Sequence, residues 1–157
     1  MSQWFRVFGR NGAPVPPAAL LQWLHEQEEE ATASFRGDDL GWFESSVQFD
    51  PETPPLRIDR YLTKEDEIRG ELNTWAAWLE SLGENPTHLQ LMQRIIGTTQ
   101  LLTMHQPLDD ADEISDDPRV ETLCVGLCQF LALASDGVYQ VDHRGFFAAD
   151  GTLLVAE

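Results

Sequence analysis

Positive charge is the scarcest feature of this sequence. Its 157 residues hold ten lysines and arginines against 27 aspartates and glutamates, a net charge of −17, and Lys64 is the only lysine. Nucleic-acid binding draws most of its affinity from cationic side chains that neutralise phosphates, so this composition argues strongly against a nucleic-acid ligand. It also disfavours docking on anionic membranes. Attraction to a basic protein surface is compatible with it.

Cysteines and long apolar runs are also scarce. The two cysteines are too few for a disulfide framework in a chain of this size. No apolar run approaches the roughly 18 residues that a membrane helix requires. The first twenty residues contain Arg6 and Arg10 and no continuous apolar core of the kind that marks a signal peptide. We therefore expect a cytoplasmic protein in a reducing compartment, with no membrane association.

No catalytic or cofactor-binding signature is present. The four histidines are scattered without HxH or HExxH spacing, and no GxSxG elbow occurs. Asp109 to Asp117 hold six carboxylates, but this segment lacks the central glycine and the ligand spacing of a calcium loop. We expect residues 106–117 to form an exposed acidic loop, and we expect neither a cofactor nor a metal. These absences favour a non-catalytic protein over an enzyme.

The apolar content is high enough for a packed core. Apolar residues make up 42% of the chain and aromatics 10%, which is sufficient to offset the entropy of ordering it. The length matches one ordinary domain, and no linker or repeat divides it. We expect a single domain over residues 1–157.

Several segments have the two-residue period of β-strands. Residues 3–10 alternate, residues 31–49 form a hairpin with its turn near Gly37, and residues 55–62 form a further strand between prolines. Residues 138–156 contain two or three short strands with Asp150-Gly151 as a tight turn.

Four segments have helical periodicity. One helix enters at Pro16-Pro17 and ends in the acidic run 28–30. A second begins at the N-cap Thr63, with Asp66 in a capping-box position, and ends at Gly83. The others cover residues 85–97 and the apolar segment that follows the Asp117-Pro118 start. Residues 98–108 remain ambiguous between helix and strand.

This order of elements predicts the fold class. Strand, helix, three strands, three helices and two strands point to an α+β fold with a mainly antiparallel sheet. In this fold, three N-terminal strands and a C-terminal hairpin pack against three to four helices.

Cys124 and Cys128 lie four residues apart, on one face of the last helix. Their parallel directions make a bridge between them awkward. As metal ligands they would need two more donors, which His105 or His143 could supply. Their apolar surroundings favour core packing instead, with thiol pKa values raised by burial.

A mixed aromatic and charged sheet face is the main candidate site. Strict alternation predicts one core-facing set: Phe5, Val7, Phe43, Val47, Phe49, Ile58 and Leu62. It places on the opposite face Trp4, Arg6, Phe8, Trp42, Glu44, Arg57, Asp59 and Tyr61. Because tryptophan, tyrosine and arginine are common interface anchors, we nominate as binding residues Trp4, Arg6, Trp42, Arg57 and Tyr61.

Three functions compete. We expect first a small acidic, non-catalytic domain that binds a basic protein, like an inhibitor or immunity protein. The alternative is a small-molecule domain or small enzyme with a pocket between sheet and helices. In such a pocket, an anionic ligand beside Trp42 or Tyr61 would be attracted by three arginines, Arg6, Arg57 and Arg60. The third is an oligomeric assembly component with contacts through Trp4, Trp23 and Trp78; the sequence leaves the oligomeric state open.

Overall fold

The structure is a computed structural model that describes residues 3–28, 30–49, 54–62, 66–106 and 118–157. Its elements in chain order are β1 (Phe5–Gly9), α1 (Pro17–Gln27), β2 (Thr32–Asp38), β3 (Gly41–Gln48), β4 (Leu56–Leu62), α2 (Asp66–Ser81), α3 (Pro86–Ile96), β5 (Gln100–His105), α4 (Pro118–Ala134), β6 (Gly137–Val141), β7 (Gly145–Ala148) and β8 (Leu153–Ala156). The acidic loop predicted over 106–117 lies outside the described residues except for Gln106, and so do the predicted caps Thr63 and Asp117.

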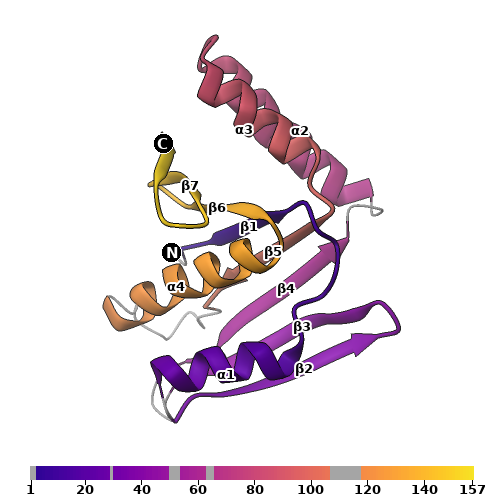
Figure 1. Cartoon of the computed structure of the whole chain (residues 1–157), viewed down its shortest axis with the longest axis vertical. Helices are drawn as coiled ribbons and strands as arrows, with labels where there is room; N and C mark the ends of the chain where they lie inside the picture. Colours follow the sequence, from indigo (N-terminus) through magenta and orange to yellow (C-terminus); the bar gives the residue numbers. More distant parts are fainter. Residues whose placement is uncertain (1–2, 29, 50–53, 63–65, 107–117) are drawn as a thin grey trace.

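One eight-stranded antiparallel sheet organises these elements, in the order β2-β3-β4-β5-β1-β6-β7-β8 (Figure 1). This confirms the predicted α+β class with a mainly antiparallel sheet. The sheet is larger than expected because the ambiguous segment 98–108 contains β5. That strand lies between β4 and β1, with its first five residues buried. A strand buried on both faces loses the polar alternation that identifies half-exposed strands.

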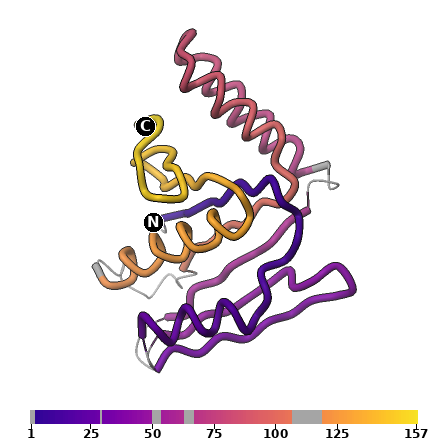
Figure 2. The backbone as a smooth tube through the Cα atoms, in the orientation of Figure 1, coloured from indigo at the N-terminus to yellow at the C-terminus, as the bar shows by residue number. Residues whose placement is uncertain are grey.

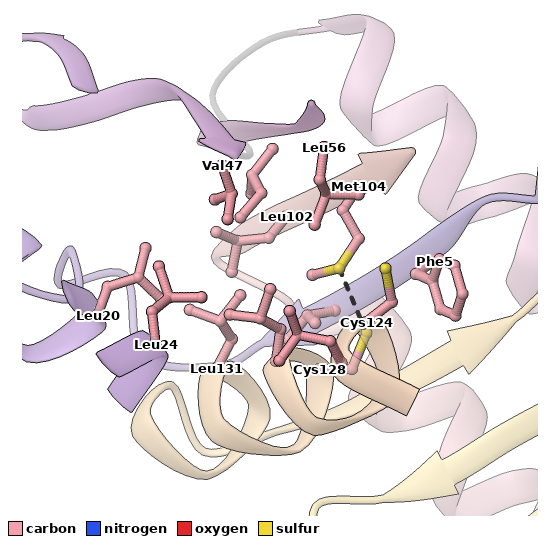
Figure 3. Packing of buried hydrophobic residues seen from close by; sticks show 14 of the residues in the cluster. Phe5, Leu20, Leu24, Val47, Leu56, Leu102, Met104, Cys124, Cys128 and Leu131 are labelled. Carbon is pink, nitrogen blue, oxygen red and sulfur yellow. Dashed lines mark hydrogen bonds between the residues drawn. The ribbon is translucent and has the colours of Figure 1, made fainter. Parts of the chain in front are cut away.

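Helices α1 and α4 cover one face of the sheet, which we call the inner face. It carries the larger hydrophobic core, where Leu20 and Leu24 of α1 and Leu127 of α4 meet strand residues such as Val7 and Leu102. Figure 3 shows this packing around Cys124, Cys128 and Met104. The apolar character of α4 on most sides follows from its place against β1 and β6 in this core.

Helices α2 and α3 form a hairpin on the other face, which we call the outer face. A second core joins Leu72 and Leu79 of α2 and Ile95 of α3 to Phe8 and Leu101 of the sheet. In Figure 1 this hairpin projects away from the end of the molecule that holds α1. Asn85 caps α3, since its side chain accepts a hydrogen bond from the Thr87 backbone N–H at 2.8 Å.

A β-bulge in β3 makes the predicted facing of Trp42 and Phe43 wrong. Arg36 pairs with Glu44 and Gly37 pairs with Trp42, so Phe43 has no partner in β2. The extra residue reverses the alternation beyond it. Trp42 therefore points into the inner core, where it is 4% exposed, while Phe43 is 40% exposed on the surface.

The first and last described residues, Gln3 and Glu157, both bond to residues at the end of strand β6. Gln3 donates a hydrogen bond to the Asp142 carbonyl, and the Gln140 side chain donates to Glu157. The backbone trace in Figure 2 shows the two marked ends on the same side of the molecule. Among the described helices, none combines the length and apolarity needed to cross a membrane.

Candidate functional site

Polar side chains line up across the middle of the outer face. The strand register places Glu44 of β3, Asp59 of β4, Thr103 of β5, Arg6 of β1 and Gln140 of β6 side by side. We call these five residues the outer polar row. Because they come from five different strands, only the folded sheet brings them together.

Arg6 joins the row to helix α2. Its Nε donates to Glu71 at 3.1 Å, and its Nη1 donates to Gln140 and to Asp142, each at 2.8 Å. The guanidinium also lies 5.3 Å from the ring centroid of Trp75 and 6.0 Å from that of Trp4. With two carboxylates and two aromatic rings around it, Arg6 already has a full set of partners.

Asp142 stays ionised beside this arginine. Burial raises the pKa of its carboxyl, but hydrogen bonds from Gln140, Arg6 and the Trp4 backbone N–H outweigh that effect and hold the pKa below its usual value. Asp142, next to the Gln140 end of the outer polar row, is therefore negatively charged at neutral pH.

Arg57 forms the exposed end of the site. Its Nε lies 3.0 and 3.1 Å from the two oxygens of Asp59, and its Nη2 donates to the same carboxylate at 3.1 Å. Asp59 and Glu44 raise the pKa of Arg57, and the hydrogen bonds that the guanidinium donates to Asp59 have the largest effect. Glu44 in turn contacts Arg36 at 3.5 Å. The Arg57 side chain is 48% exposed, so a partner could reach it.

Trp4 and His105 stack next to Arg57. Their ring centroids are 3.9 Å apart, and the ring planes differ by 18°. Burial lowers the pKa of His105, Arg57 lowers it further, and Asp59 opposes both effects. Within the residues that the structure describes, the buried Nδ1 atom has no hydrogen-bond partner. His105 is therefore a neutral ring at pH 7, which suits stacking on an indole.

The structure gathers only some of the five nominated binding residues. Trp4, Arg6 and Arg57 lie together on the outer face. Tyr61 shares that face but is half-buried against the core under α2. Trp42 lies on the inner side, where its Nε1 donates to the Val15 carbonyl at 2.8 Å. Trp42 is consequently a core residue, not part of this surface.

Arg60, which was considered for an anionic ligand, is a buried structural residue. Its Nε donates to Gln100 at 2.7 Å, and its two Nη atoms donate to the carbonyls of Gly12, Leu40 and Trp42. Burial lowers the pKa of the guanidinium, and the negative charge of Asp38 opposes this effect without outweighing it. Arg60 clamps the loop after β1 to the β2–β3 hairpin.

Cys124 and Cys128 are free and buried in the inner core. Burial raises the pKa of Cys124 to about 12 and that of Cys128 well above its usual value. The Cys128 thiol points at the Met104 sulfur at 3.9 Å (Figure 3). Within the part of the chain that the structure describes, no group of three His, Cys, Asp or Glu side chains could hold a metal.

A cleft adjoins the row at Asp142. It has a volume of about 530 Å³, and its lining consists of Trp78, Asp142, His143 and Glu157. His143, the histidine with the most suggestive sequence context, is exposed in the β6–β7 turn with a φ of 68°. An aromatic ring with two carboxylates is a suitable environment for a cationic group.

Sequence reasoning missed His105, Gln140 and Asp142 as members of the site. The sequence signal for His105 was the two-residue period in which Thr103 and His105 alternate with Leu102 and Met104. This period did not settle the assignment, because the segment that forms β5 could equally be read as a helix. Gln140 could be placed only once β6 was known to lie beside β1.

In comparisons with protein-family models, with curated proteins and with solved structures, the chain matched none. Its function therefore has to be inferred from its own residues and geometry.

Proposed function

We propose that this protein is a non-catalytic interaction domain that binds a basic partner protein, in the manner of an inhibitor or immunity protein. The observation that carries the proposal is the unequal pairing of its charges. The arginines are mostly occupied within the fold, whereas many carboxylates face solvent without a cation. We place this activity in the cytoplasm, where free thiols are stable.

Most arginines contribute little positive charge to the surroundings. Those with a carboxylate partner are Arg6, Arg10, Arg36, Arg57 and Arg144. Arg60 and Arg69 donate instead to uncharged acceptors. These internal pairs cancel much of the positive charge close to its source.

The exposed carboxylates are not cancelled in this way. Within the described ranges, those without an ion-pair partner are Glu26, Glu28, Glu30, Asp38, Asp39, Glu67, Glu80, Glu84, Asp150 and Glu157. They surround the molecule with a negative potential, which accelerates encounter with a basic surface and repels nucleic acid and anionic membranes.

The outer polar row and its cleft supply the proposed contact surface. Trp4 and His105 offer a half-buried aromatic platform, and Arg57 projects beside it. The cleft at Trp78 and Glu157 can receive a lysine or arginine side chain of the partner, because an aromatic face and carboxylates together stabilise a cation. This arrangement resembles the intramolecular one around Arg6.

The alternative function, binding or turnover of an anionic small molecule, has less support, because the arginines proposed for it already have partners. Arg6, Arg57 and Arg60 would have to give up hydrogen bonds that they already make within the fold. An anion placed there would also meet Asp59 and Asp142. The outer polar row is therefore better matched to a cationic partner than to an anionic metabolite.

The test is capture of partners from a native lysate at about 50 mM and about 500 mM salt. We expect a basic protein that binds at low salt and is released at high salt.

Two matched pairs of variants localise the contact. Glu157→Gln should weaken binding more than Glu26→Gln, an equal charge change on α1. Trp4→Leu should weaken it about tenfold or more, and Trp23→Leu on the inner side should not.

Several outcomes would contradict the proposal. They are the absence of any partner at either salt concentration, and a partner whose binding does not depend on salt. Equal effects of Trp4→Leu and Trp23→Leu would place the contact away from the outer polar row. Purified partner and purified variants, compared by titration calorimetry, give the affinities.

A further inference from the structure

A cavity lies away from the outer polar row, between α3, the C-terminal end of α4 and strands β6 to β8. Its volume is about 410 Å³, within the range of roughly 300–1,000 Å³ typical of small-molecule sites. Its floor is apolar and firmly built, since Leu91, Ala132 and Val138 are all buried core residues that line it.

One face of α3 supplies the polar side of the cavity. Thr87, Gln90, Leu91 and Arg94 follow one another at helical spacing, so their side chains share that face. In the described ranges, the guanidinium of Arg94 has no hydrogen-bond or ion-pair partner. This distinguishes it from Arg57, whose carboxylate partner is part of the fold. Arg94 is thus a cation at a cavity wall with its donors available.

The charges around the cavity balance, although the whole chain carries −17. Asp136 lines the cavity but pairs with Arg10 at 2.8 Å. Asp150 accepts a hydrogen bond from the Thr152 backbone N–H, and this bond lowers the pKa of its carboxyl. Two arginines and two aspartates therefore meet here. Such a site can admit a single negative charge at Arg94, whereas a doubly charged phosphate would be repelled by both carboxylates.

The opposite wall exposes an unusual amount of apolar surface. Leu133 of α4 is 76% exposed, more than any other large apolar side chain in the described ranges, and it lines the cavity. Leu154 of β8 continues this wall. Covering such surface with a hydrocarbon chain is favourable because it removes apolar area from water. The wall accordingly favours a ligand with an apolar tail.

We propose that this cavity binds an amphipathic monocarboxylate. The carboxylate pairs with the fork of N–H donors of Arg94, a geometry that guanidinium groups favour. The tail lies along Val138, Leu133 and Leu154. Gln90 and Thr87 are placed to bond a second polar group on the ligand. This inference is independent of the proposed binding of a basic protein, and neither depends on the other.

The experiment uses sodium octanoate as the probe, titrated into the full chain and followed by two-dimensional ¹H–¹⁵N NMR. Acetate tests the need for a tail, octan-1-ol tests the need for a charge, and octylamine tests the sign of that charge. Arg94→Gln removes the proposed partner, and Arg94→Lys keeps the charge but loses the forked geometry. Arg36→Gln is the matched control, since it removes one charge on β2, at the opposite edge of the sheet.

We expect octanoate to shift resonances of α3, the end of α4 and β6 to β8, and acetate to shift none. Arg94→Gln should weaken octanoate binding about tenfold or more, Arg94→Lys should weaken it less, and Arg36→Gln should bind as the wild type does. The inference fails if octanoate leaves these resonances unchanged, or if octylamine binds more tightly. It also fails if Arg94→Gln and Arg36→Gln have the same effect, because the response would then reflect only net charge.

Discussion

Strand β4 carries two arginines, three residues apart, whose roles differ with the face on which they lie. Arg60 lies on the inner side, 5% exposed, and donates to uncharged oxygens of Gln100 and three backbone carbonyls. Arg57 lies on the outer side, half exposed, and pairs with Asp59 and Glu44. The same side chain is a structural clamp on one face and a solvent-facing contact on the other.

The same contrast holds for the two faces as a whole. The inner face is sealed by α1 and α4 and is largely apolar, with the buried Ser45 and a polar margin at Arg60 and Gln100. The outer face is apolar only where α2 and α3 cover it, and beyond that cover it holds the outer polar row. Stability should therefore depend mainly on the inner face, and recognition on the outer one.

The largest effect expected from this contrast concerns the thiols of the inner face. Since the pKa of Cys124 is raised to about 12 from 9.0, its thiolate fraction near pH 8 falls about a thousandfold, and burial blocks access further. We expect native protein to react with iodoacetamide at least about a thousandfold more slowly than unfolded protein. Mass spectrometry of timed samples measures both rates. Rapid labelling of the native protein would show that the inner face is open to water.

The next largest effect compares neighbouring residues of the central strand β5. Leu102 is fully buried on the inner face, and its truncation to alanine removes packed methyl groups and leaves a cavity. We expect Leu102→Ala to lower the free energy of unfolding by about 3 kcal/mol. Thr103→Val, an isosteric change in the outer polar row, should change it by less than about 1 kcal/mol. Urea denaturation followed by tryptophan fluorescence measures both, and equal losses would contradict the division of roles.

The two arginines of β4 give the third comparison. Arg60→Met leaves the Gln100 side chain and the carbonyls of Gly12 and Trp42 without their donor, so we expect a loss of about 2 kcal/mol in the free energy of unfolding. Arg57→Met should cost less, about 1 kcal/mol, since Arg57 is half exposed and solvent weakens its pair with the buried Asp59. Urea denaturation measures both losses of unfolding free energy. A larger loss for Arg57→Met than for Arg60→Met would reverse our assignment of the two roles.

The sequence was sufficient to predict most of the helices and strands that build the two faces. Periodicity identified the four helices and the alternating strands, because each buries one face against the core. It did not identify β5, since this strand is buried on both faces and its short alternation, from Leu102 to His105, could not be told from a helix. The sheet order, with β1 between β5 and β6, depends on long-range pairing that no local pattern records.

The site was predictable only in part, for a similar reason. Trp4, Arg6 and Arg57 were assigned to one face by simple alternation, and the structure places them there. Trp42 was misassigned because a single extra residue, Phe43, reverses the alternation of β3. His105 and Asp142 join the site through contacts across strands, so their roles required the fold.

The smallest effect expected concerns the pH dependence contributed by His105. Because burial holds its pKa below the usual 6.5, the unfolded chain binds the proton more tightly than the folded one does. The stabilisation is therefore complete above pH 6.5 and is lost as the pH falls below that value. Because the ring is partly exposed, solvent screens this effect, and the loss should be well under 1 kcal/mol.

His105→Gln removes this titration and keeps a polar side chain. Between about pH 7.5 and about pH 5.5, we expect the wild type to lose more unfolding free energy than His105→Gln does. Protonation of carboxylates affects both proteins equally, so the difference isolates His105. The control is His143→Asn, because asparagine tolerates the positive φ of that exposed turn residue. An identical pH response of His105→Gln and wild type would mean that the Trp4–His105 stack tolerates a charged imidazole, and the outer face would then be wetter than its half-buried aromatic platform implies.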